Sequence, residues 1–354
     1  MTMLWAQLRR IAPPRLPPRP PRPNRIFGAG SSRRAYGTEP NIPKEFLPPV
    51  PVLRPTLWAL TATATIFLGC AAYDVHRDVR DLKRRGLLKN VREASYEDVE
   101  IAKHRGGHSS RRSSSRSSPS SPSKYYPPGQ LGEVLAAYND AEKVLLGFSA
   151  LNISLLGAHY MALIQHFGHV PCFSPNYTLL TSMFGHTGLL HAGLNTFVLL
   201  QFAPQVAGEP RVFAGNGCHF AAFYLSAGIL SSLGSQISSI LPSRNYQYRR
   251  LVPHMGASGV ISAFLAMWAA LYPEASIGIL FVPGSYSAQN FLLALVAFET
   301  CGLFFGIPLV KFAHGQHLAG LAIGWAYARY DGKKHVWRPS RKAAFAVMKR
   351  LHLV

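Results

Sequence analysis

The chain has 354 residues, of which 48% are hydrophobic, and it carries a formal net charge of +21 at pH 7. The charge lies in Arg-Pro and Arg-Ser stretches with few aromatic residues between them, so the sequence does not favour nucleic-acid binding. The four cysteines have no CxxC spacing, which argues against a metal cluster or a disulfide framework (Cys70, Cys172, Cys218 and Cys301).

The N-terminal residues predict a mitochondrial transit peptide over 1–37. Up to residue 38 the chain contains eight arginines but no lysine and no acidic residue, and the first carboxylate is Glu39. Arg-rich, acid-free composition is typical of import signals. The prolines between Pro13 and Pro23 weaken an amphipathic helix, so a basic tail without a targeting role is the alternative. The Pro-rich segment 38–55 is then expected in the matrix.

The first apolar stretch, residues 56–73, contains no charge over eighteen residues. That length is just enough to cross a hydrocarbon layer of about 30 Å, and we predict an N-terminal transmembrane helix. A polar linker, 74–139, follows. Its first part, to Glu100, mixes both signs of charge and is expected as a surface helix. The Ser/Arg-rich stretch 103–124 buries too little apolar surface to order itself.

Apolar runs dominate residues 140–330 and predict six further helices, near 144–165, 184–204, 212–233, 255–272, 290–307 and 314–330. Backbone polar groups in lipid must be satisfied within the segment, so these runs are expected to form a helical bundle. The short run 277–283 cannot span and is expected to be re-entrant or interfacial. The sequence thus predicts an all-α polytopic membrane protein with one helix ahead of six (1+6). The basic tail, 331–354, lies outside the membrane.

A serine between small residues begins the fourth of these runs, in Gly256-Ala257-Ser258-Gly259. Small residues let another helix or a substrate backbone approach closely, and a packing face is the alternative to a catalytic role. Short motifs match often by chance, so this motif alone does not establish a nucleophile.

A histidine in the sixth run strengthens the catalytic interpretation. His317 is followed by Gly320 and Gly324, a GxxxG spacing that favours tight helix packing. Ionisable side chains within membrane spans are expensive and usually face a cavity or a partner. If the neighbouring helix carries Ser258, His317 can take the hydroxyl proton and return it to a leaving amine. No carboxylate lies near His317 in the sequence, so we predict a dyad; His314 is the competing base.

The second run carries His191 and Asn195, which are four residues apart and share one helix face. Both can donate hydrogen bonds, and an acyl-transfer intermediate needs donors aimed at its oxyanion. Hydrogen bonding between helices is the alternative role for such a pair.

Together these motifs resemble the rhomboid family of intramembrane serine proteases, over about residues 140–330. The residues that carry the resemblance lie in three runs: Gly256, Ser258 and Gly259; His317, Gly320 and Gly324; and His191 and Asn195. The additional helix and the import signal resemble the mitochondrial branch, the presenilin-associated rhomboid-like proteases of the inner membrane.

The resemblance implies a rhomboid six-helix bundle with Ser258 as nucleophile and His317 as general base. It implies His191, Asn195 and the Ser258 N–H as oxyanion donors, with no metal and no cofactor. It also implies substrates that are single-span membrane proteins within the bilayer, including a dynamin-like fusion GTPase of mitochondria.

Two departures and one residue stand outside this pattern. The loop 166–187 lacks the Trp-Arg pair of many bacterial members, and Ser262 replaces an aromatic residue that stacks on the catalytic histidine in some members. Glu299, deep in the fifth run, is either functional or a carboxylate hydrogen-bonded within the bundle.

Two other functions are compatible with the same residues. A rhomboid-like protein could bind membrane helices without cutting them, although the motifs are intact. A metal transporter would need four histidines to converge (His186, His191, His314 and His317), yet the chain has no HExxH motif or acidic ligand cluster. Seven spans with a matrix start would place the linker and the basic tail on the intermembrane side, against the positive-inside expectation.

Overall fold

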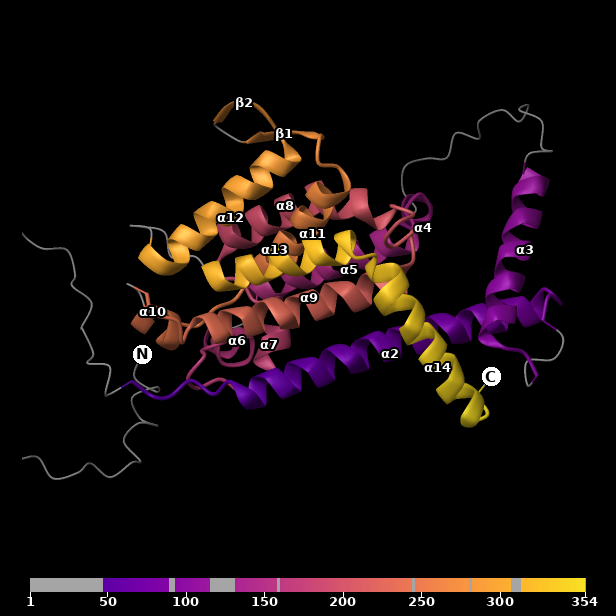
Figure 1. Cartoon of the computed structure of the whole chain (residues 1–354), viewed down its shortest axis with the longest axis horizontal. Coiled ribbons are helices and arrows are strands. Elements are labelled where there is room, and N and C mark those ends of the chain that lie inside the picture. Colours follow the sequence, from indigo (N-terminus) through magenta and orange to yellow (C-terminus); the bar gives the residue numbers. More distant parts are fainter. Residues whose placement is uncertain are drawn as a thin grey trace, which may run out of the picture. The chain divides into compact units, whose positions relative to one another are not determined.

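The computed structural model describes residues 47–88, 93–114, 131–157, 160–243, 246–279, 282–306 and 313–353. The predicted transit peptide, 1–37, and the start of the Pro-rich segment lie outside the described residues. Helices dominate the described chain (Figure 1). In chain order the elements are α2 (Leu53–Arg84), α3 (Tyr96–Ser114), α4 (Leu131–Ala136), α5 (Asp140–Ser154), η2 (Leu155–Gly157), α6 (Tyr160–Phe167), α7 (Thr178–Thr181), α8 (Leu189–Ala207), α9 (Gly217–Ser238), α10 (Tyr246–Leu251), α11 (Ser258–Leu271), β1 (Ser276–Ile279), β2 (Val282–Ser287), α12 (Ala288–Phe305), α13 (His314–Arg329), η3 (Lys333–Trp337) and α14 (Arg338–Arg350).

The N-terminal helix α2 is much longer than the eighteen residues predicted for it. Its 32 residues span about 48 Å at 1.5 Å per residue, more than a hydrocarbon layer of about 30 Å. Among the described residues, three helices are long and apolar enough to cross a membrane: α2, α9 and α12. The chain is therefore a mostly helical, polytopic membrane protein, whereas the 1+6 arrangement of crossings stays a prediction.

The first helix of the bundle differs from the single span expected near 144–165. It begins earlier, at Asp140, because Asn139 and Glu142 form a capping box: each side chain accepts the other residue's backbone N–H. It also ends earlier, at Ser154, and a 3₁₀ turn to Gly157 precedes the short helix α6. The apolar run continues through this break, so hydropathy could not reveal it.

Three other segments show local structure that the sequence analysis did not predict. Residues 277–279 and 282–283, from the segment expected to be re-entrant or interfacial, lie in a two-stranded antiparallel hairpin in which Ile277 pairs with Tyr286. Helix α3 continues to Ser114, into the stretch expected to lack order. Its first turns pack Val99 and Ala102 against α2, and extending a helix that has already nucleated is favourable. The basic tail contains the helix α14, which packs on α2 and α3.

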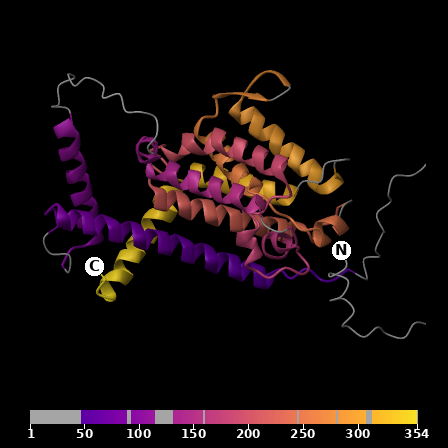
Figure 2. The same cartoon turned by 180° about the vertical axis from the view of Figure 1, so that it is seen from behind.

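The centre of the bundle is α9, which contacts α2, α5, α11 and α13 (Figures 1 and 2). Its N-terminus is set by Asn216, whose side chain accepts the backbone N–H of His219 at 2.8 Å. Aromatic side chains from α9 and its neighbours form the core around it: Phe213, Phe220, Phe223, Tyr224 and Phe264. This packing holds α9 and α13 against α11, the helix that begins with Ser258.

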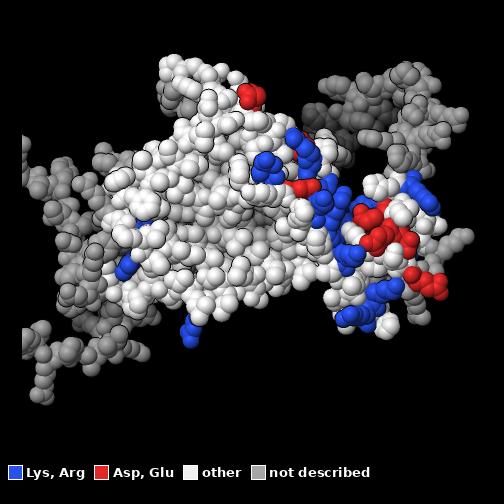
Figure 3. Space-filling view, in the orientation of Figure 1, with Lys and Arg blue, Asp and Glu red and all other residues white. Residues whose placement is uncertain are grey.

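Charged residues are distributed unevenly over the surface. In Figure 3 the helices of the bundle present an almost uncharged face, and Lys, Arg, Asp and Glu gather where α2, α3 and α14 meet. An uncharged surface fits a hydrocarbon environment, in which an exposed charge is costly.

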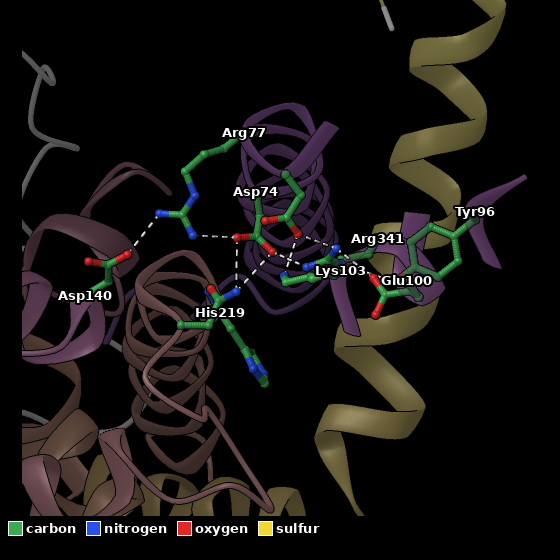
Figure 4. Close-up of polar contacts among 10 residues, drawn as sticks. Asp74, Arg77, Tyr96, Glu100, Lys103, Asp140, His219 and Arg341 are labelled. Atoms are coloured by element: carbon green, nitrogen blue, oxygen red, sulfur yellow. Dashed lines mark hydrogen bonds and ion pairs between the residues drawn. The ribbon is translucent and has the colours of Figure 1, made fainter. Parts of the chain in front are cut away.

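At the charged end of the molecule a network of polar contacts is centred on the buried Asp74. We call it the Asp74 junction: Asp74, Arg77, Glu100, Asn216 and Arg341 (Figure 4). Asp74 on α2 is fully buried and accepts hydrogen bonds from Arg77, Asn216 and Arg341. Arg341 also reaches Glu100 on α3, at 2.8 Å. Burial opposes the charge of Arg341, but Asp74 and Glu100 outweigh it and raise the pKa of this guanidinium. The junction thereby joins α2, α3 and α14 to the start of α9.

Candidate active site

The two residues expected to act together lie within hydrogen-bond distance. Ser258 is the first residue of α11 and His317 lies in the first turn of α13. The Ser258 Oγ is 2.9 Å from the His317 Nε2, although the residues are 59 positions apart in the sequence. Both side chains are partly buried, and only 13% of the His317 side chain is exposed. This is the arrangement that general-base activation of a hydroxyl requires.

Close contact between α11 and α13 depends on glycines. A Cβ on Gly320 would lie 2.1 Å from the carbonyl oxygen of Gly259, and one on Gly324 would lie 1.8 Å from that of Ala263. Side chains at these positions would therefore force the helices apart. The glycines bring α13 close enough for His317 to reach Ser258.

Gly256 was expected to pack within a helix interface. It lies instead in the turn before α11, with φ of +131°. A Cβ there would be 3.0 Å from the His191 Nε2 and 3.3 Å from the Asn195 Nδ2. The turn before Ser258 therefore lies directly against both predicted oxyanion donors on α8. All three sequence motifs meet at this point.

His191 and Asn195 each have a side-chain N–H group that can donate a hydrogen bond near this turn. The backbone N–H of Thr187 donates to the His191 Nδ1 at 3.4 Å, so a neutral ring carries its hydrogen on Nε2, the nitrogen that faces Gly256. The Asn195 Nδ2 is buried and has no hydrogen-bond partner among the described residues. Ser258 adds its own backbone N–H, because the first N–H groups of a helix lack partners within it.

Glu299 is the residue that the sequence did not connect to this site. It lies on α12, 96% buried, and its Oε1 is 2.9 Å from the His317 Nδ1. Its Oε2 is 2.5 Å from the Nδ1 of His314. The expected two-residue arrangement is therefore revised, since a carboxylate from a third helix contacts the histidine. Helix periodicity could not predict this contact, which depends on how α12 turns towards α13.

The histidines required by the transporter alternative form two pairs. His314 and His317 share Glu299, whereas His186 packs edge-on against His191 with ring centroids 5.2 Å apart. Within the described ranges, no group of three or more His, Cys, Asp or Glu side chains is placed to hold a metal ion.

Comparison with known proteins identifies the class to which this fold and site belong. Residues 174–334 match the Rhomboid domain family. The matched region contains His191, Asn195, Ser258 and His317. The chain therefore contains a rhomboid domain.

Individual relatives indicate the branch. The chain is 32% identical to the presenilin-associated rhomboid-like protein A, mitochondrial, of Danio rerio over 208 residues, which are 56% of this chain and 50% of that protein. It is 32% identical to the human presenilin-associated rhomboid-like protein, mitochondrial, over 45% of this chain and 39% of that protein. Rhomboid protein 1, mitochondrial, of Saccharomyces cerevisiae is 28% identical over 44% of this chain and 42% of that protein.

The chain thus spans about half the length of the curated relatives it matches. The expected mitochondrial, presenilin-associated rhomboid-like branch is confirmed by these similarities. The protein is a multi-pass mitochondrial membrane protein.

Proposed function

We propose that the chain is an intramembrane serine protease of the mitochondrial inner membrane, which hydrolyses peptide bonds in or near the transmembrane segment of single-span proteins. The observation that carries the proposal is the 2.9 Å hydrogen bond between the Ser258 Oγ and the His317 Nε2. In this mechanism His317 takes the hydroxyl proton while Ser258 attacks the scissile carbonyl. His317 then returns the proton to the leaving amine, and water hydrolyses the acyl-enzyme.

The turn around Gly256 supports stabilisation of the intermediate. The Ser258 N–H, the Asn195 Nδ2 and the His191 Nε2 would donate to the oxyanion that forms when Ser258 attacks. Preorganised donors of this kind are each worth about 2.7 to 4 kcal/mol in the barrier. The unpartnered Asn195 amide is suited to the role, because a buried donor without a partner is otherwise unfavourable.

The length of α11 supports chemistry below the membrane surface. Its 14 residues span about 21 Å, so the helix cannot cross a layer of about 30 Å on its own. With Ser258 at its first position, the nucleophile would lie inside the membrane slab. A substrate helix would have to unwind locally to present its carbonyl, so substrates with helix-breaking residues are expected to be cleaved faster.

The test uses the full chain reconstituted with a single-span membrane substrate. Ser258→Ala should abolish cleavage, and Ser154→Ala, an exposed serine on α5, serves as the matched control. A serine-directed fluorophosphonate should label wild type and Ser154→Ala but not Ser258→Ala. Full cleavage by Ser258→Ala would disprove the assignment. Binding of the substrate without cleavage or labelling by the wild type would indicate a non-catalytic helix-binding protein.

A further inference from the structure

We propose that Glu299 is a positioning residue for His317, and that His314 holds Glu299 in place. The catalytic unit is then a chain of four side chains, Ser258–His317–Glu299–His314, drawn from three helices. This inference rests on the proposed protease function and deepens it. It replaces the dyad expected from the sequence.

Glu299 determines which nitrogen of His317 carries the hydrogen. An ionised carboxylate only accepts hydrogen bonds, so the contact between Glu299 and the His317 Nδ1 places a hydrogen on that nitrogen. The neutral ring then has its lone pair on Nε2, which faces the Ser258 hydroxyl at 2.9 Å. Glu299 thereby selects the tautomer that can act as a base. It also stabilises the imidazolium that forms when the proton is taken.

Two histidines of α13 hold the Glu299 carboxylate in place. The two Nδ1 atoms, from residues one helical turn apart on α13, contact different oxygens of Glu299. A carboxylate fixed at both oxygens cannot rotate away from His317. His314 therefore contributes to the orientation of His317 through Glu299.

Helix α12 has a space for His314 close to the carboxylate. Gly302 follows Glu299 by one turn, and a Cβ on Gly302 would lie 2.2 Å from the His314 Cε1. The imidazole thus packs directly on the α12 backbone. Phe298 covers it from the side, with ring centroids 6.1 Å apart. His314 is buried as a result, with 6% of its surface exposed.

Burial gives the carboxylate a large effect on its neighbours. An isolated buried charge is strongly unfavourable, and Glu299 is tolerated because both of its oxygens accept hydrogen bonds. Two further histidines, His191 and His254, interact electrostatically with His317 from α8 and from the turn before α11. Glu299 is an acidic group in direct contact with the base, at 2.9 Å.

The test compares Glu299→Gln, Glu299→Asp and His314→Phe in the reconstituted full chain. Glu299→Gln removes the charge and places an amide N–H₂ against one of the rings, so kcat should fall about 100-fold or more with KM within about threefold. Replacing the carboxylate of a serine protease triad by its amide lowers kcat by about 10⁴, which sets the upper end. Glu299→Asp keeps the charge and should recover kcat to within about tenfold of wild type.

The remaining variants separate positioning from folding. His314→Phe keeps a ring against Gly302 but removes the donor, and should lower kcat about tenfold. Glu209→Gln alters a carboxylate that contacts Arg211 and Tyr272 outside the site, and should leave kcat unchanged. Thermal unfolding of each variant shows how much of its effect is structural.

The outcomes also distinguish this inference from the proposed function. If Ser258→Ala is inactive while Glu299→Gln keeps kcat within about threefold of wild type, the inference is wrong and the protease assignment stands. If Ser258→Ala is as active as wild type, the protease assignment itself is wrong. Glu299→Asp as slow as Glu299→Gln would also overturn the inference. Should Glu299→Gln fail to fold, unchanged kcat in both Glu299→Asp and His314→Phe would contradict it.

Discussion

Two buried carboxylates, Glu299 and Asp74, illustrate two ways of holding helices together in one membrane protein. Glu299 contacts two histidines, His314 and His317, beside helices whose backbones almost touch. Asp74 contacts Arg77 and Arg341, two guanidiniums that stay charged, and joins helices through ion pairs at the end of the molecule where charges gather.

The difference lies in what the partner can do with a proton. A guanidinium is effectively always protonated, so the Asp74 junction can stabilise the helix packing but cannot take part in proton transfer. An imidazole changes charge near neutral pH, so a carboxylate beside it can also influence a proton transfer. A buried carboxylate therefore stabilises the structure at one end of the molecule and, in our proposal, contributes to the chemistry at Glu299.

The largest effect is expected where backbones touch. Gly320→Ala would place a Cβ 2.1 Å from the Gly259 carbonyl oxygen, so α11 and α13 must separate and the Ser258–His317 hydrogen bond must lengthen. We expect cleavage to fall at least 100-fold, because small misplacements at a catalytic group are costly. Gly193→Ala, which meets nothing within 4 Å, is the matched control. Equal cleavage rates for the two variants would show that the close helix contact at Gly320 does not determine the Ser258–His317 geometry.

The junction should show the opposite pattern, with stability lost and chemistry kept. Asp74→Asn leaves the buried Arg341 without its closest carboxylate, and breaking a buried pair costs about 3 to 5 kcal/mol. Because Arg341 keeps Glu100, we expect the lower end of that range. Denaturant unfolding measures the loss, and kcat of the folded fraction should stay within about twofold. A large fall in kcat would mean that the junction and the site are coupled.

A double-mutant cycle measures the coupling between Asp74 and Arg341 directly. Arg341→Met removes the guanidinium and leaves Asp74 with Arg77 and Asn216, so we expect it to destabilise less than Asp74→Asn does. Residues that share a network typically show coupling energies of about 0.5 to 3 kcal/mol. The double variant should therefore be more stable than the sum of the single losses predicts. Simple additivity would contradict the ion pair between Asp74 and Arg341.

The smallest effect on stability is expected at an exposed ion pair at the charged end of the molecule. Lys342 donates to Glu97 at 3.1 Å, with both side chains more than 60% exposed. This hydrogen bond lowers the pKa of Glu97, so any stabilisation is present above the ordinary carboxyl pKa and disappears as the pH falls through the lowered value. Lys342→Gln should leave thermal unfolding unchanged and move the Glu97 pKa back up, which an NMR titration can measure.

The sequence alone carried the main features of the fold and of the proposed site. Apolar runs predicted the helices of the bundle because burial in lipid leaves a strong local signal. The spacing of Gly320 and Gly324 behind His317 predicted a close approach to the helix of Ser258, and the 2.9 Å hydrogen bond agrees with that prediction. His191 and Asn195 share a face by helix geometry, and that face lies against Gly256.

Only the tertiary structure decided which carboxylates serve which partners. Glu299 and His317 are 18 residues apart on different helices, and Asp74 and Arg341 are 267 residues apart, so neither contact leaves a local pattern. Each depends on how a helix is rotated about its axis and which neighbour it meets, and this is set by packing over the whole bundle. The β1–β2 hairpin and the packing of α14 on α2 could not be predicted for the same reason. Local hydropathy indicates that a segment is buried but does not identify the segment against which it packs.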